Sequence, residues 1–288
     1  MPILSVGPVS LIVPSLEKSV AFYANVLGFS TLGRANATAS LGTSDGNVLL
    51  ELIENPVAVR PGRRSPGLFH FAVLFPTRAS LGQELIHLLE SGWNLSGAGD
   101  HLVSEALYLN DIDGNGIELY ADRPRETWTF KNGQVQMDTL TVDIDSLLAE
   151  AKRDSSPWTG LPIGTTMGHV HLKVSDVDAA GRFYRDIIGL DLMATMPQAQ
   201  FLAADGYHHH LGLNTWMSGG SPAAPEGSLG LNAFTINIPD QLELEAIINR
   251  LRTNNIDFEL KDSGATTQDP SKTKVRLRVS GSALPFGS

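Results

Sequence analysis

Apolar positions recur at roughly helical spacing in several segments of the chain. Within residues 15–27, roughly helical spacing is shown by Leu16, Val20, Phe22, Tyr23 and Leu27, which predicts an amphipathic helix. Similar segments predict helices at residues 79–89, 178–188 and 242–252, and a further one at 144–152.

Short alternating or apolar runs follow the first three of these helices. Glycine, aspartate and asparagine bound the runs, as is typical of strands that end in turns. The runs are residues 39–41, 48–53, 106–109, 117–120, 200–202 and 208–213.

The chain also repeats itself. Residues 7–29 align without a gap with residues 168–190, and GLFHFAVLFP at 67–76 corresponds to GLNAFTINIP at 230–239. Such repeats indicate one structural unit used several times. Each unit has the order strand, helix, three strands, and four units fit: residues 3–56, 66–122, 166–216 and 228–280.

These four βαβββ modules predict an α+β protein. Residues 1–122 form a first pair of modules and residues 166–288 a second pair. Residues 123–165 are a long connection between the pairs, which contains the helix expected at 144–152.

Composition narrows the chemistry. The 288 residues include no cysteine, so any metal must be held by histidine, aspartate or glutamate. The formal net charge of −10 argues against a nucleic-acid partner, which needs clustered basic residues. There is no run of about 18 apolar residues and no basic leader at the start, so we expect no membrane span and, by default, a cytoplasmic location.

One motif is more specific. The plan of four modules resembles the vicinal-oxygen-chelate superfamily, and residues 99–118 resemble the signature of its extradiol ring-cleaving dioxygenases. Ile112 departs from the signature, which usually has proline there. The stretch GYHHHLGLNTW at 206–216 is similar to the bacterial catechol-2,3-dioxygenase type. The seven positions that match the signature are Gly99, His101, Leu107, Tyr108, Asp111, Gly114 and Glu118.

The resemblance implies two open mixed-sheet barrels, each made of two modules, around a metal. It also implies a site of two histidines and one carboxylate, a set that suits non-haem Fe(II), with Mn(II) as an alternative. His70, His169 and Glu118 occupy the ligand positions of modules two and three. The corresponding positions elsewhere are Pro8, Ala233 and Arg276, although Glu51 lies in the last strand of module one.

This set departs from the related extradiol enzymes, whose site lies between modules three and four. Here the ligands meet only if modules two and three pair, or if two chains share a site in a homo-oligomer. His171, two residues after His169, is the rival ligand because both side chains face one side of a strand. A histidine at the head of a strand is by itself more often structural than a ligand.

The resemblance also supplies catalytic residues. His209 matches the acid–base histidine, and imidazole titrates near neutral pH. If His209 faces the site, a strand would turn His208 and His210 away from it. The alternative is that all three histidines form a solvated polar edge.

His101 and Tyr108 match the histidine and the tyrosine, respectively, that lie on the substrate side of the family's site. Their odd spacing would place them on opposite faces of a continuous strand, so a bend or bulge must intervene. Tyr108 could equally be a half-buried aromatic of the strand. Trp216 and Asn214 could close the mouth of the pocket, whereas His87 reads as a surface residue of a helix.

The implied reaction is extradiol cleavage of a catechol-type ring with O₂ to a muconic semialdehyde type of product. A glyoxalase-like lyase or isomerase is one alternative, but that chemistry usually needs a fourth protein ligand. A small-molecule binding protein of the resistance type and a metal-free member of the superfamily are the others.

Overall fold

The computed structural model describes residues 4–154, 156–261 and 264–281. Their strands form two eight-stranded mixed sheets and one short two-stranded sheet, with few helices, so the predicted α+β class is confirmed. None of the described helices is long and apolar enough to cross a membrane.

The first sheet has the order β16-β17-β18-β15-β1-β4-β3-β2. It therefore contains the strands of the first and fourth predicted modules. Their bounds are β1 (Ser5–Val13), β2 (Ser30–Ala35), β3 (Thr38–Gly42), β4 (Val48–Glu54), β15 (Gly230–Ile238), β16 (Phe258–Lys261), β17 (Gly264–Gln268) and β18 (Lys274–Val279).

The second sheet has the order β12-β13-β14-β11-β5-β8-β7-β6. It contains the strands of modules two and three, the pairing that the ligand positions require within one chain. Their bounds are β5 (Gly67–Leu74), β6 (Gly97–Asp100), β7 (Ser104–Asn110), β8 (Gly116–Asp122), β11 (Thr166–Lys173), β12 (Asp191–Met196), β13 (Ala199–Ala203) and β14 (Leu211–Asn214).

By its internal contacts the chain divides into two compact units. One comprises residues 1–12, 57–69 and 169–288, and the other comprises residues 13–56 and 70–168. Three of the four boundaries fall inside β1, β5 and β11, and the fourth falls between β4 and β5, so each unit holds parts of several modules.

The unit of residues 13–56 and 70–168 contains three α-helices whose ends follow from local sequence. Helix α1 (Leu16–Asn25) begins after Ser15, whose side chain accepts a hydrogen bond from the Lys18 amide. Helix α2 (Arg78–Ser91) is capped by Thr77 and ends at Gly92, which adopts φ 70°. The predicted helices at residues 15–27 and 79–89 are thus confirmed.

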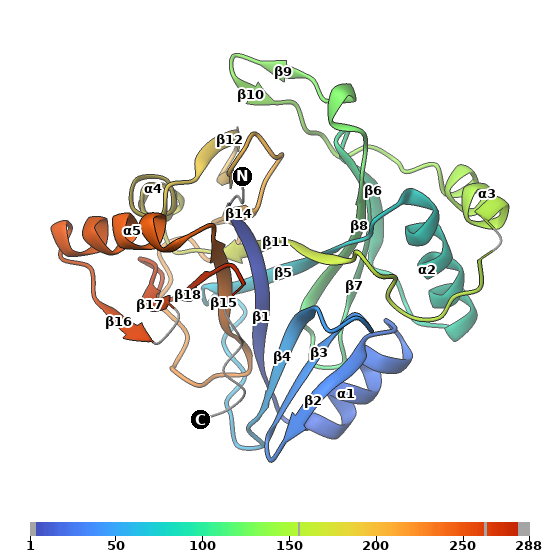
Figure 1. Ribbon diagram of the computed structural model, residues 1–288, viewed down its shortest axis with the longest axis horizontal. Helices are drawn as coiled ribbons and strands as arrows, with labels where there is room; N and C mark the ends of the chain where they lie inside the picture. The colour runs from blue at the N-terminus through green and yellow to red at the C-terminus, as the bar shows by residue number, and fades with distance from the viewer. Residues whose placement is uncertain (1–3, 155, 262–263, 282–288) are drawn as a thin grey trace. The chain divides into compact units, whose positions relative to one another are not determined.

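The long connection carries the third of these helices, α3 (Ile144–Asp154), as predicted. Figure 1 shows α3 beside α2. Gly82 permits this approach, because a Cβ atom there would lie 2.7 Å from the Leu147 carbonyl oxygen. The connection also forms η1 (Arg125–Thr127) and the hairpin β9 (Phe130–Lys131) and β10 (Gln134–Val135).

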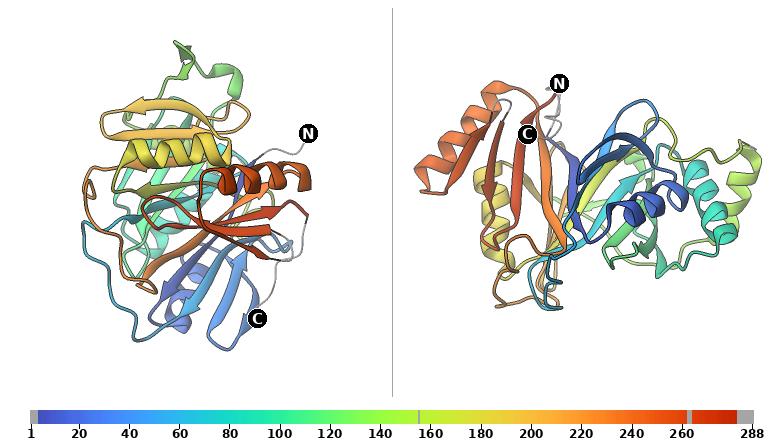
Figure 2. Two further views of the ribbon diagram at one scale, coloured as in Figure 1. Left: turned by 90° about the vertical axis from the view of Figure 1, so that its left-hand side faces the viewer. Right: turned by 90° about the horizontal axis from the view of Figure 1, so that it is seen from below.

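The other unit holds helices α4 (Val177–Arg182) and α5 (Gln241–Thr253). The helix predicted at 178–188 changes pitch, because α4 continues into a π-helix, η2 (Phe183–Ile188). Figure 2 shows α4 and α5 as neighbours, and the Arg250 guanidinium donates to the Ile187 carbonyl oxygen at 2.7 Å.

A buried tyrosine–aspartate pair recurs in each half of the chain. The Tyr23 hydroxyl donates to Asp111 at 2.7 Å, and the Tyr184 hydroxyl donates to Asp269 at 3.0 Å. Each carboxylate also accepts amide hydrogen bonds from its own turn, which precedes β8 or β18. Asp111, one of the signature residues, therefore has a structural role: its hydrogen bond with Tyr23 connects α1 to the β7–β8 turn.

Candidate metal centre

Three buried side chains converge in the structure. His70, Glu118 and His169 each offer one ligand atom, and these atoms all lie within 4.8 Å of one another. Their exposed fractions are 8%, 3% and 1%. Among the described residues, these three side chains form the one group of histidines and carboxylates found close enough together to hold a metal ion. They are the same three residues that the comparison of the modules predicted as ligands.

Glu118 owes its place to the pairing of β8 with β5. The two strands are parallel, with Phe71 opposite Ile117 and Ala72 opposite Glu118, so His70 lies near the carboxylate. The His70 Nε2 atom is 3.0 Å from the Glu118 Oε2 atom. Two ligand atoms on adjacent corners of an octahedron, each bonded at roughly 2.1 Å, are about 3 Å apart.

The donor set fits a divalent transition metal. Two imidazoles and one carboxylate form the facial set of non-haem Fe(II) sites and leave positions open for other ligands. Burial strengthens the fit, because a carboxylate in the interior of a strand needs an opposite charge or strong hydrogen bonds.

Tyr108 lies directly across the β7–β8 ladder from Glu118. Its hydroxyl hydrogen-bonds the Glu118 carboxylate. Burial raises the pKa of the Tyr108 hydroxyl well above its ordinary value, and the negative charge of Glu118 raises it further. Tyr108 is therefore a neutral hydrogen-bond donor at the edge of the triad.

His101 contacts Tyr108 across a bend in the chain, one of the two irregularities predicted between them. Its Nε2 atom is 2.6 Å from the Tyr108 hydroxyl oxygen. The expected bend is present: β6 ends at Asp100, and the chain turns at Leu102, which has φ 69°. The turn lets the imidazole fold back over Gly99 toward the neighbouring strand.

The long connection fixes the other side of this imidazole. The His101 Nδ1 atom lies 2.9 Å from the Asp138 carbonyl oxygen. Leu140 and Asp100 exchange two backbone hydrogen bonds, which hold the connection beside β6. A carbonyl oxygen only accepts, so Nδ1 carries a proton. Asp138 contributes through its backbone, and sequence reasoning missed it.

Replacing Gly99 by alanine is expected to displace His101. The added Cβ atom would lie 3.1 Å from the His101 Nε2 atom, tighter than an ordinary contact. Gly97→Ala on the same strand is the matched control, because a Cβ atom there meets nothing within 4 Å. We expect Gly99→Ala to lower the rate (kcat) of a reaction at the triad about tenfold, as is typical when the group that orients a proton donor, here Tyr108, moves, with metal content unchanged. Equal kcat values for the two variants would contradict this role of Gly99.

The three consecutive histidines do not alternate across a strand. Strand β14 begins only at Leu211, so His208, His209 and His210 precede it. His208 and His209 are both buried, and their Nδ1 atoms are 2.8 Å apart. The His209 ring lies 4.1 Å from the His169 ring, between centroids. The His208 ring also lies 6.3 Å from the His169 ring, so the prediction that His208 points away from the site was wrong, and burial of His208 and His209 contradicts the alternative of a solvated edge.

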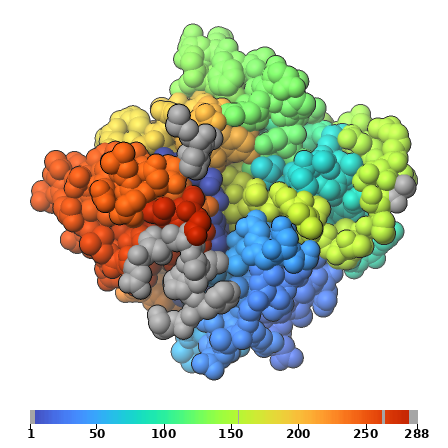
Figure 3. Space-filling model, in the orientation of Figure 1, coloured from blue at the N-terminus to red at the C-terminus, as the bar shows by residue number. Residues whose placement is uncertain are grey.

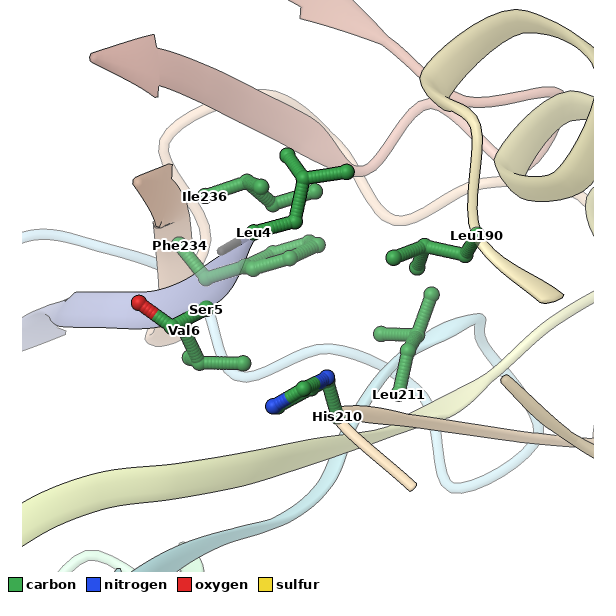
Figure 4. Close-up of a pocket in the computed structure, with 8 residues that line it drawn as sticks. All are labelled: Leu4, Ser5, Val6, Leu190, His210, Leu211, Phe234 and Ile236. Atoms are coloured by element: carbon green, nitrogen blue, oxygen red, sulfur yellow. The ribbon is translucent and has the colours of Figure 1, made fainter. Parts of the chain in front are cut away.

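His210 lies elsewhere in the same unit. Its Nδ1 atom accepts a hydrogen bond from the Ala204 amide at 3.2 Å, and its ring stacks on Tyr207. Figure 4 shows the His210 ring at the wall of a small apolar pocket, beside Val6 and Leu211. Of the three histidines, His208 and His209 are those whose rings contact His169.

His171 is buried but is not a member of the triad. Its Nε2 atom lies 3.0 Å from the Asn214 amide nitrogen, which makes it an acceptor for that side chain. Trp216 follows Asn214 and is 46% exposed. His87 stacks on Trp158 at 3.5 Å between ring centroids.

Sequence comparison places this geometry in a family. A model of the Glyoxalase/Bleomycin resistance protein/Dioxygenase superfamily matches residues 5–119 and 166–268. The chain belongs to this superfamily.

Individual relatives agree with this membership. The chain is 43% identical over 285 residues to a catechol-2,3-dioxygenase of Bacillus subtilis (strain 168), covering 98% of this chain and 96% of the relative. It is 30% identical over 153 residues to biphenyl-2,3-diol 1,2-dioxygenase 3 of Rhodococcus globerulus, covering 51% of this chain and 80% of that relative. Glyoxalase I from Zea mays shares the fold, with a TM-score of 0.59, 16% identity, and coverage of 96% of this chain and 92% of that one.

Proposed function

We propose that the protein is an Fe(II)-dependent extradiol dioxygenase that cleaves a catechol-type ring with O₂ to a muconic semialdehyde type of product. The observation that carries the proposal is the 43% identity, over nearly the whole chain, to a catechol-2,3-dioxygenase. The buried triad supports it, because its donor set suits Fe(II).

His70, Glu118 and His169 would hold the metal. A bound Fe(II) supplies a Lewis acid that orients and polarises two vicinal oxygens, together with electrons for reaction with O₂. Mn(II) is the alternative, since these ligands discriminate weakly between the two ions.

Three further residues near the triad, His209, Tyr108 and His101, would transfer protons or donate and orient hydrogen bonds. Imidazole can take and return a proton near neutral pH, so His209, whose ring contacts His169, would serve as the acid and base. Tyr108 would donate its hydroxyl proton in a hydrogen bond to charge that develops on a substrate oxygen. His101, held by the Asp138 carbonyl, would orient the Tyr108 hydroxyl.

The test begins with anaerobic purification and measurement of bound iron and manganese. A panel of catechols is then added with O₂, and oxygen uptake is followed together with the yellow colour of a semialdehyde product. We expect oxygen uptake equal to the amount of product formed. Bound metal without oxygen uptake across the panel would overturn the proposal and favour a lyase or a binding protein.

A further inference from the structure

The polar side chains of β11 share one face of the strand. Val170 and Leu172 are fully buried apolar residues, whereas His169, His171 and Lys173 alternate with them. A ligand bound at His169 would therefore extend past His171 if it followed this face.

A chain of ring contacts leads from His169 along this face. The His169 ring contacts His209 at 4.1 Å between centroids, and His209 contacts Phe201 at 5.1 Å. Phe201 contacts His171 at 5.7 Å. His171 in turn contacts the aromatic pair Phe69 and Trp216, at 5.0 Å and 5.5 Å.

The aromatic pair is exposed but held in place. Phe69 and Trp216 are 39% and 46% exposed, and their rings meet edge to face at 5.4 Å. The Trp216 indole nitrogen donates to the Pro197 carbonyl oxygen at 3.2 Å, and the Trp216 amide donates to the Asn214 side chain at 3.3 Å. Fixed orientation lowers the entropy cost of binding a ligand to these rings.

The His171 ring is fixed as well. The Asn214 Oδ1 atom accepts from the Trp216 amide, so the Asn214 Nδ2 atom faces His171 and donates to its Nε2 atom. Gly212 makes room for the ring, because a Cβ atom there would lie 2.8 Å from the His171 side chain. His171 and Trp216, at the outer end of the path, are thus held in fixed orientations.

We propose that Phe69 and Trp216 bind an apolar or aromatic substituent of the substrate, so that the enzyme prefers a ring-substituted diol to unsubstituted catechol. This inference rests on the proposed dioxygenase function. The two neighbouring rings expose apolar area to water, and burial of such area favours binding by roughly 25 cal/mol per Å².

Lys173 suggests a different substituent on the substrate, a carboxylate, as the alternative to an apolar one. Lys173 is half-buried on the same face of β11, and its side chain has no hydrogen bond or ion pair with another described residue. A carboxylate on the substrate would suit this lysine. We favour the apolar substituent over the carboxylate, because the Phe69 and Trp216 rings contact each other and both contact His171, the last ring in the series that begins at His169.

The test compares three diols: catechol, biphenyl-2,3-diol and a catechol that bears a carboxylate. We expect the wild-type protein to show the highest kcat/KM on biphenyl-2,3-diol, by about tenfold over catechol, a typical margin for an apolar pocket contact. Trp216→Ala and Phe69→Ala should each lower the ratio of these two values about tenfold, mainly through KM. Trp216→Phe should restore most of the ratio.

Met217→Ala is the matched control. Met217 is the next residue after Trp216, is 52% exposed and belongs to no ring contact of the path, so its variant should keep the wild-type ratio. A loss in Trp216→Ala that is equal on all three diols would assign Trp216 a structural role and overturn the inference. A preference for the carboxylated diol that Lys173→Met abolishes would also overturn it. Activity on catechol in either case would leave the proposed function standing, whereas inactivity on every diol would remove both.

Discussion

Replacing His169 by alanine is expected to abolish metal binding and to lower ring cleavage about 10³-fold or more. The reason is that a metal acting as a Lewis acid contributes several kcal/mol to transition-state stabilisation, and each 1.4 kcal/mol is a factor of ten in rate. With His169 gone, only His70 and Glu118 of the triad remain. Metal content is measured on anaerobically purified protein and turnover by oxygen uptake.

The matched control for this variant is His171→Ala. It removes a buried imidazole from the same face of the same strand but leaves the triad whole. We expect it to retain one equivalent of metal. Full metal occupancy in His169→Ala, with loss in His171→Ala, would show that the ligand is misassigned between the two. Circular dichroism of both variants separates this result from unfolding.

A second large effect, on the pH dependence of stability, is expected from Glu84. This residue is buried on α2 and is not a member of the metal triad. Its Oε2 atom accepts a hydrogen bond from the Trp158 indole at 2.7 Å, and its Oε1 atom has no hydrogen-bond partner among the described residues. Burial raises the pKa of Glu84 to about 8, although the Trp158 hydrogen bond opposes this shift.

Trp158 belongs to the segment between α3 and β11. In Figure 3 this yellow-green segment crosses the surface between α2 and the blue residues of module one, and the Leu161 amide donates to the Gly28 carbonyl oxygen at 2.9 Å. The carboxyl group of Glu84 therefore lies beneath a segment that packs against two modules.

The pH dependence of stability follows from this raised pKa. Between the ordinary pKa of 4.5 and about 8, the folded protein keeps a proton on Glu84 that the unfolded chain has released. The free energy of unfolding therefore falls as pH rises through this window, by up to about 1.4 kcal/mol per pH unit. Above pH 8 both states are ionised and the loss is complete.

Replacing Glu84 by glutamine removes this titration. We expect the variant to be more stable than the wild-type protein at pH 8.5 by about 1–3 kcal/mol, because the neutral amide avoids burial of a charge. Urea denaturation between pH 6.5 and 9 measures the effect. This range avoids Asp269, whose pKa is raised to about 6 by burial. Glu90→Gln, at an exposed position of the same helix, is the control, and an unchanged pH slope in Glu84→Gln would contradict the prediction.

The triad could be predicted because the chain contains four repeated modules, whose corresponding positions can be compared with one another. Four modules can be compared at each ligand position, and the residues that correspond to His70, Glu118 and His169 include Pro8, Ala233 and Arg276, which are not metal ligands; only Glu51 of module one could also bind metal. The helices and most strands were also predictable, since their apolar spacing agrees with their packing.

The errors arose at turns. His208 and His209 precede β14, and the signal for a turn was present in Asp205 and Gly206, which both adopt positive φ. The bend between His101 and Tyr108 was expected from their odd spacing, but its position at Leu102 could not be predicted, because leucine rarely adopts φ 69°. The carbonyl of Asp138 could not be predicted at all, since every residue type has one.

The paired tyrosine–aspartate hydrogen bonds have a consequence for a divided chain. Each pair lies within one half of the sequence, Tyr23 with Asp111 and Tyr184 with Asp269. The metal donors do not follow this division, since two precede the long connection and His169 comes after it. Two fragments separated within residues 123–165 would each keep an intact tyrosine–aspartate pair, yet neither would carry all three donors. Metal uptake would then serve as a reporter of fragment complementation, a use that a site built within one half could not offer.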